Sequence, residues 1–132
     1  MDDLRSAAIT EIEALHVEFE RWFNGESGSL DRVERVLAKD FTMIPPSGET
    51  VERADLIAGL KKAHGAVELS IEIRNPIVRW SGAEGLLVSY EEWQHTPDKM
   101  NGRQSTALFV SDADAPNGLR WVHVQETWMP DS

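Results

Sequence analysis

Glu126 is the residue whose type and position point most directly to chemistry. In the predicted strand 119–129, Val122, Val124 and Trp128 share one face with it, since alternate side chains of a strand lie on the same side. A carboxylate on an apolar face loses hydration, which raises its pKa unless a cation lies opposite. Such a group can act as a general base or hold an amine or hydroxyl group. The alternative is a hydrated acid at the mouth of a pocket.

The strand predicted over 86–95 supplies a second polar set. His95, Glu91 and Trp93 share one parity, and Arg103 lies across the following hairpin. We expect them to form a polar cluster at the open end of the site. A bulge would reverse the faces, so the alternation leaves open which side of this strand points into a pocket.

Aromatic and aliphatic side chains at helical or strand spacing would form the walls of a pocket. The candidates are Phe19, Trp22, Phe41, Met43, Phe109, Val124 and Trp128. A flat, apolar ligand would suit such walls. The competing interpretation is that these residues are simply the hydrophobic core.

Other kinds of site have little support in the sequence. The histidines at positions 16, 64, 95 and 123 lack metal-ligand spacing, and there is no cysteine. No glycine-rich phosphate loop or nucleophile elbow is present. We therefore expect a protein without metal or cofactor.

The overall charge restricts the partners. The chain has 13 basic and 23 acidic side chains, a formal charge of −10, which disfavours nucleic acid and anionic membrane surfaces. Its acidic start is followed by a polar, periodic stretch, and no apolar run is long enough to span a membrane. We expect a soluble, cytoplasmic protein, and its 132 residues predict one domain over 1–132.

The elements that must position these residues divide into helices followed by strands. Apolar residues at steps of three and four predict helices over 4–23, from about 29 or 31 to 37, and 53–64. Strands are predicted over 41–44, 49–51, 68–80, 86–95, 103–110 and 119–129. Asn75-Pro76 must fall at a bulge or an edge, because proline cannot donate to a ladder. This order predicts an α+β fold with a largely antiparallel sheet.

Neither face of the later strands is charged throughout. On strand 119–129, Trp121, His123 and Gln125 oppose the face of Glu126, and each face carries a tryptophan. Helices can cover one side of the sheet, so a second copy of the chain is the economical cover for the other. We expect a homodimer through the face of Trp121, His123 and Gln125; ordinary apolar surface is the alternative.

The layout resembles nuclear transport factor 2-like proteins, including SnoaL-like proteins and the association domain of calcium/calmodulin-dependent kinase. The likeness is carried by residues 19–25, 37–42 and 119–128, with Gln125 where a second histidine usually stands. It implies a cone-shaped curved sheet, mixed or antiparallel, wrapped on three helices (the cystatin-like roll). It also implies a conical cavity and a dimer through the outer sheet face. The catalytic sets of ketosteroid isomerases and epoxide hydrolases in this superfamily find no convincing match.

Three functions remain open from the sequence. The first is a homodimeric protein that binds a small, largely apolar molecule in a conical pocket. The second is a cofactor-free isomerase, cyclase or lyase, with Glu126 as base and His95 or Tyr90 orienting the substrate. The third is a non-catalytic dimerisation module with a filled core.

Overall fold

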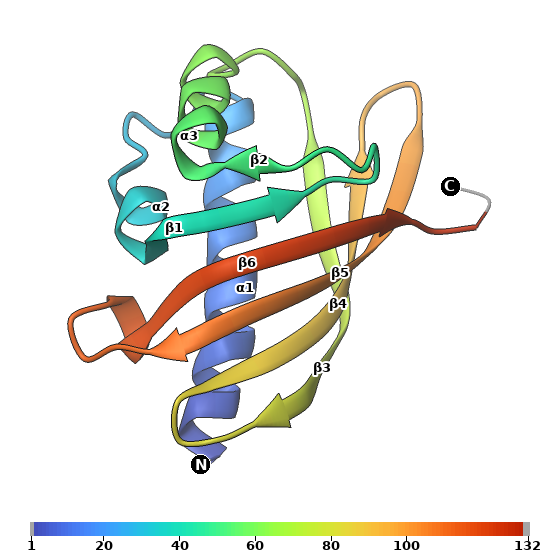
Figure 1. The fold of residues 1–132 in the computed structure, drawn as a ribbon. Coiled ribbons are helices and arrows are strands. Elements are labelled where there is room, and N and C mark those ends of the chain that lie inside the picture. Colours follow the sequence, from blue (N-terminus) through green and yellow to red (C-terminus); the bar gives the residue numbers. More distant parts are fainter. Residues whose placement is uncertain (1, 131–132) are drawn as a thin grey trace.

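A long first helix lies in the hollow of a curved sheet (Figure 1). The structure is a computed structural model that describes residues 2–130. Helix α1 spans Asp2–Phe23, and its side chains Ala8, Ile12 and Leu15 are fully buried. Their spacing of three and four residues places one apolar stripe against the sheet, as the sequence predicts.

Two shorter helices flank the start of the sheet. Helix α2 (Asp31–Val36) begins where the Ser29 hydroxyl accepts a hydrogen bond from the backbone N–H of Asp31. Helix α3 (Arg53–Lys62) directly follows strand β2 (Val51–Glu52). Strand β1 (Leu37–Ile44) starts four residues earlier than predicted, since it follows α2 directly and pairs with the C-terminal strand from Leu37 onward.

The sheet is mixed, with the strand order β2-β1-β6-β5-β4-β3. The four long strands of the second half are β3 (Ser70–Ser81), β4 (Gly85–His95), β5 (Met100–Ser111) and β6 (Leu119–Trp128), with the short 3-10 helix η1 (Pro116–Gly118) before β6. Strands β1 and β6 are parallel, and the other neighbours are antiparallel. The predicted α+β class with a curved mixed sheet is confirmed (Figure 1).

The predicted irregularity at Asn75-Pro76 is confirmed. The register of β3 against β4 shifts between Arg74 and Ile77, and Asn75 has a φ of 54°. Because β3 is an edge strand, the missing N–H of Pro76 leaves no central ladder broken.

A second bulge changes the faces of β6. The register against β5 passes from Leu108–His123 to Phe109–Trp121, which leaves Val122 as the extra residue. Trp121 therefore turns to the hollow side of the sheet and is buried there. The expectation that Trp121 lies on the outer face with His123 and Gln125 is wrong, because strict alternation cannot anticipate a bulge.

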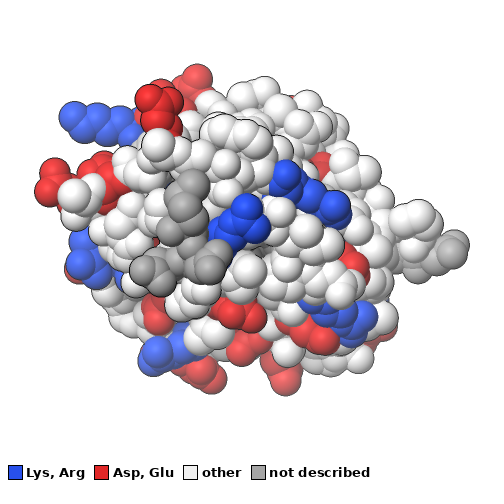
Figure 2. Space-filling view, turned by 90° about the horizontal axis from the view of Figure 1, so that it is seen from below, with Lys and Arg blue, Asp and Glu red and all other residues white. Residues whose placement is uncertain are grey.

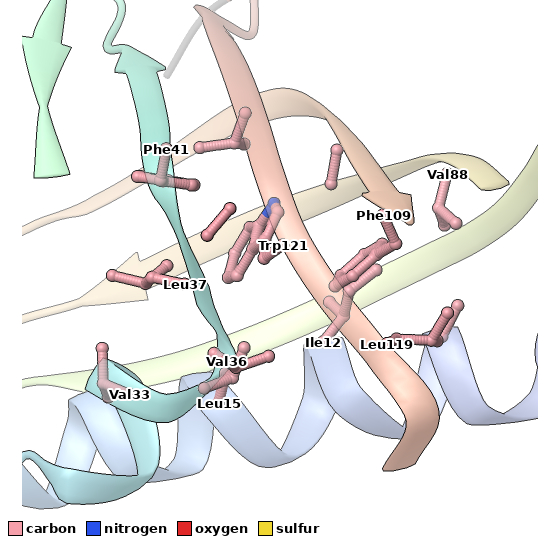
Figure 3. Packing of buried hydrophobic residues seen from close by; sticks show 14 of the residues in the cluster. Ile12, Leu15, Val33, Val36, Leu37, Phe41, Val88, Phe109, Leu119 and Trp121 are labelled. Carbon is pink, nitrogen blue, oxygen red and sulfur yellow. The ribbon is translucent and has the colours of Figure 1, made fainter. Parts of the chain in front are cut away.

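The hydrophobic core lies between α1 and the hollow side of the sheet. In Figure 3, Ile12 and Leu15 rise from α1 toward Trp121, Phe109 and Leu119. On the face shown in Figure 2, acidic and basic side chains are intermixed around uncharged surface. None of the helices in residues 2–130 is long and apolar enough to cross a membrane.

Candidate functional site

A cavity of about 200 Å³ opens between the helices and the hollow side of the sheet. Its lining comes from α1, α3 and five strands of the sheet. The residues are His16, Phe19, Phe23, Leu37, Phe41, Met43, Leu56, Leu60, Ile71, Tyr90, Glu92, Gln94, Arg103, Trp121, Val124 and Glu126. Most are apolar, and the polar ones come from α1, β4, β5 and β6.

Aromatic rings form much of the wall. Phe41 and Trp121 meet edge to face with ring centroids 5.9 Å apart, and Figure 3 shows Phe41 on β1 and Trp121 near the middle of the cluster. Phe19 meets the ring of His16 at 5.5 Å, and Tyr90 does so from the sheet side at the same distance. Edge-to-face contacts of this kind fix ring orientation, so the walls are preorganised.

A buried ion pair joins α1 to β4 at the cavity. His16 Nε2 lies 3.0 Å from Glu92 Oε1, and His16 Nδ1 lies 2.7 Å from the carbonyl oxygen of Ile12. Both partners are acceptors, so both ring nitrogens carry protons when both bonds form. Gln94 Nε2 donates to Glu92 Oε2 at 2.7 Å, which completes the bonding of the carboxylate.

The pKa of His16 is raised and the pKa of Glu92 is lowered by their contact. Burial disfavours the charged form of His16, but the carboxylate of Glu92 outweighs it and the pKa of His16 is raised. Burial also disfavours ionised Glu92, yet the charge and hydrogen bond of His16 lower the pKa of this carboxyl below its usual range. Each member of the pair therefore favours the charged form of the other.

A second ion pair stands nearer the mouth. Arg103 Nη1 donates to Glu126 Oε1 at 3.1 Å and Nη2 donates to Asn101 Oδ1 at 3.3 Å. The Arg103 guanidinium lies 4.8 Å from the centroid of the Trp128 ring, which is half exposed at 50%. Burial and then the neighbouring Glu92 carboxylate raise the pKa of Glu126, although Arg103 acts in the opposite direction.

Tyr90 lies between the two pairs along the wall. Burial first, and then the charges of Glu92 and Glu126, raise the pKa of Tyr90 well above its usual value. Its hydroxyl therefore stays protonated and can donate a hydrogen bond. The site combines a protonated phenol with the His16–Glu92 and Arg103–Glu126 pairs inside an apolar cavity.

Comparison with known proteins places the chain in a family. Residues 9–130 match the model of the sucrose-6-phosphate phosphohydrolase C-terminal family. The chain belongs to this family. It is also an NTF2-like protein, which confirms the resemblance predicted from the sequence.

Three similar proteins illustrate the range of this NTF2-like fold. An NTF-2 like protein of unknown function from Pseudomonas aeruginosa is 30% identical, with a TM-score of 0.86 over 93% of this chain and 98% of that chain. A CaMKII hub from S. rosetta is 17% identical, with a TM-score of 0.76 over 94% of this chain and 95% of that chain. Sucrose-phosphatase 2 of Nicotiana tabacum is 24% identical over 90% of this chain, which spans only 30% of the tobacco protein.

Part of the predicted site of this NTF2-like chain comes together at the cavity. Among the predicted residues, those that line it are Phe19, Phe41, Met43, Tyr90, Arg103, Val124 and Glu126. Glu126 and Arg103 form an ion pair. A cation therefore does lie opposite this acid, which is the condition under which no raised pKa was expected from the sequence.

Three predicted residues lie on the outer side of β4 instead. Glu91 accepts hydrogen bonds from Asn75 and from the indole N–H of Trp93, and Trp93 also packs over Gly102. His95, with 37% of its side chain exposed, lies 3.6 Å from Glu72. The structure therefore does not bring Glu91, Trp93 or His95 to Glu126.

Three predicted wall residues lie near the cavity without lining it. Trp22 donates its indole N–H to the carbonyl oxygen of Leu60 at 2.6 Å. Phe109 is fully buried and stacks on Trp121 at 5.4 Å, behind the wall. Trp128 covers Arg103 from the solvent side.

The cavity residues outside the predicted set include His16, Glu92 and Gln94. The parity of β4 contains the signal, since Leu86, Val88 and Tyr90 form one apolar face that Glu92 continues. An acid that continues a buried face needs a partner, and His16 lies on the buried side of α1. Among residues 2–130, no group of three or more histidine, aspartate or glutamate side chains is placed to hold a metal ion.

Proposed function

We propose that this chain binds a small, largely apolar organic molecule in the cavity between α1 and the sheet. The observation that carries the proposal is a cavity of about 200 Å³ with aromatic walls and a few convergent polar groups. An engineered apolar cavity of about 150 Å³ accommodates benzene. The volume here therefore suits a single ring with a short substituent.

The name of the matched family does not define the ligand. A phosphate group would bring negative charge against Glu92 and Glu126, and the Glu92 charge already raises the pKa of Glu126. We therefore base the proposed ligand on the pocket itself, and we do not extend the activity of sucrose-phosphatase to this chain.

Methionine-methyl NMR tests the binding proposal. Met43 lines the cavity, whereas Met100 is exposed at the end of β5. Toluene or benzyl alcohol should shift the Met43 methyl signal in a saturable way and leave Met100 unchanged. Val124→Phe, which fills the cavity, should abolish the shift, and Leu108→Phe on the other side of the sheet should not. Equal shifts at Met43 and Met100 would contradict the proposal.

We further propose that the outer sheet face joins two copies of the chain. This side carries exposed Ile77 and Trp80 together with half-buried Leu87 and Leu108. An apolar strip on the open side of a sheet is well suited to an isologous dimer. Light scattering should give twice the monomer mass at micromolar concentration, and Leu87→Asp should give a monomer. A wild-type monomer would refute this proposal.

The predicted cytoplasmic location and the single domain over 1–132 stay as parts of this proposal. Fractionation of cells that express the protein tests the first, and one cooperative unfolding transition tests the second. A dimer whose cavity accepts no compound would instead support the non-catalytic dimerisation module.

Acid–base catalysis is a second candidate because Glu126 combines a raised pKa with a place on the cavity wall beside Tyr90. Glu126 would take a proton from carbon next to a carbonyl, and the Tyr90 hydroxyl would hydrogen-bond the resulting enolate oxygen. His95 takes no part, since it lies on the outer face.

Proton exchange into a small ketone tests this candidate. Cyclohexanone in D₂O should exchange its α-protons faster with the protein than with buffer alone. Glu126→Gln should remove the acceleration, whereas Glu91→Gln, an outer-face control of equal charge change, should keep it. Exchange at the buffer rate with wild-type protein would remove this reaction from consideration.

A further inference from the structure

Most polar atoms of the cavity are already bonded to protein. Both ring nitrogens of His16 have acceptors, and both oxygens of Glu92 have donors. The two ring nitrogens are therefore unavailable for a ligand unless an existing bond breaks, and each Glu92 oxygen already accepts one hydrogen bond. The His16–Glu92 pair therefore acts on the cavity through the electrostatic field of its charges and not through a direct hydrogen bond to a ligand.

Arg103 is also held by protein. Its Nη1 binds Glu126, its Nη2 binds Asn101, and one face of the guanidinium lies on the Trp128 ring. These three contacts fix the cation at the mouth. Among residues 2–130 the Nε of Arg103 has no hydrogen-bond partner, so a ligand carboxylate would share this cation with Glu126 and lie beside a like charge.

Two acceptor oxygens on the cavity wall remain open to a ligand. Glu126 gives Oε1 to Arg103, and among residues 2–130 its Oε2 has no hydrogen-bond partner. Only 4% of the Glu126 side chain is exposed, and it lines the cavity. Gln94 donates its amide to Glu92, which leaves its carbonyl oxygen as a second acceptor on the same wall. A ligand that brings hydrogen-bond donors would satisfy both of these oxygens.

The electrostatic surroundings favour a charged donor. Burial and the Glu92 carboxylate oppose the ionisation of Glu126, whereas Arg103 and His16 favour it, so an ammonium beside Glu126 would add to these two cations in stabilising the carboxylate. The cavity also presents the rings of Phe19, Phe41 and Trp121, and aromatic faces attract organic cations.

We propose that the pocket selects a small primary amine with an apolar, single-ring body, its ammonium group bound by the Glu126 Oε2 oxygen and its ring held by Phe41 and Trp121. The proposal rests on the proposed binding function and names the ligand class. An ammonium carries three donors, which matches a carboxylate oxygen with a neighbouring amide oxygen. A charge-assisted bond in a poorly hydrated site is roughly twice as strong as a neutral one.

A series of ligands with the same ring tests this selectivity on the wild-type protein. Calorimetric titration would compare toluene, benzyl alcohol, benzylamine and benzoate, which differ mainly in the group on the ring. We expect benzylamine to bind about tenfold or more tighter than benzyl alcohol, and benzoate to bind most weakly. Benzoate as tight as benzylamine would overturn the proposal.

The neutral compounds, toluene and benzyl alcohol, distinguish failure of the amine selectivity from failure of the binding function. If toluene or benzyl alcohol binds but benzylamine is no tighter, the amine selectivity fails and the binding function stands. If none of the four binds, both proposals fail.

Glu126→Gln tests the assigned atom. This change keeps the shape and an acceptor for Arg103 but removes the negative charge. Benzylamine should lose its advantage of about tenfold over benzyl alcohol, while toluene affinity stays within about twofold. Glu91→Gln removes the same charge from the outer face and should leave the whole series unchanged. An amine preference that survives Glu126→Gln would overturn the assignment.

Discussion

Neighbouring acids on β4 have opposite surroundings. Glu91 lies on the outer face among Asn75, Trp93 and solvent, and Glu92 lies on the inner face against His16. Both accept two hydrogen bonds, and both have lowered pKa values. The difference is burial, since the inner pair has almost no contact with water.

The same contrast recurs in two arginine–tryptophan contacts. Arg103 lies 4.8 Å from the Trp128 ring on the inner face, and Arg74 lies 4.8 Å from the Trp93 ring on the outer face. Each arginine also pairs with a glutamate, Glu126 inside and Glu72 outside. Similar geometry therefore occurs on both faces, and only the inner ion pair is shielded from solvent. The lesson is that hydrogen-bonded clusters alone do not mark a site; a cluster beside a cavity does.

The largest expected effect comes from removing one member of the inner pair. Glu92→Ala leaves His16 buried without its partner, so we expect a loss of about 3 kcal/mol in the free energy of unfolding. Glu91→Ala should cost less than about 1 kcal/mol, because water replaces its contacts. Urea unfolding measures both. Equal losses would contradict the contrast between the faces.

The two arginines provide the next comparison. Arg103→Met leaves the Glu126 carboxylate without its cation and should destabilise by about 2 kcal/mol. Arg74→Met removes a solvent-exposed pair and should have little effect. Thermal unfolding of the two variants beside wild type tests this, and a larger loss at Arg74 would be the opposite of what the structure implies.

The pH dependence of the inner pair has a definite sign. The raised pKa of His16 gives stability that is present below the usual value of 6.5 and lost as pH rises through the raised one. The lowered pKa of Glu92 gives stability that is present above 4.5 and lost as pH falls through the lowered value. The advantage of wild type over His16→Gln should therefore be greatest between pH 4.5 and 6.5 and shrink above.

Unfolding free energies of both proteins at a series of pH values provide the measurement. The effect should be smaller than the loss in Glu92→Ala, since glutamine retains part of the packing and hydrogen bonding. An advantage that grows steadily from pH 6 to pH 9 would contradict the assigned pKa of His16.

Salt should give the smallest difference. Exposed pairs such as Arg74–Glu72 are screened at about 1 M salt, where the Debye length is roughly 3 Å. The small cost of Arg74→Met should therefore vanish at high salt, and the cost of Arg103→Met should persist. Repeating the thermal unfolding with added sodium chloride measures this; equal salt sensitivity would place both arginines in the same environment.

Most of the fold could be predicted from the sequence because its signals are local. The stripe of α1, the turn residues and the irregularity at Asn75-Pro76 each follow from spacing or backbone chemistry. The start of β1 at Leu37 could not be predicted from local sequence, because it depends on parallel pairing with β6, a distant segment of the chain.

The site was harder to predict for a different reason. The bulge at Val122 reverses the face of Trp121, and strand alternation has no signal for it. On β4 the polar residues Glu91, Trp93 and His95 were predicted to lie at the site. The site is instead on the opposite, apolar face, which Glu92 continues. A buried acid can be recognised in a sequence only together with its partner. Here the partner, His16, lies 76 residues away in the chain, so no local pattern connects the two.

A crystal structure of the protein with benzylamine tests the central claim most directly, namely that the inner face of the sheet holds the binding site. We predict the amine nitrogen within about 3 Å of Glu126 Oε2 and the ring against Phe41 and Trp121. A ring bound on the outer face beside Trp93, with the cavity unchanged, would contradict the account.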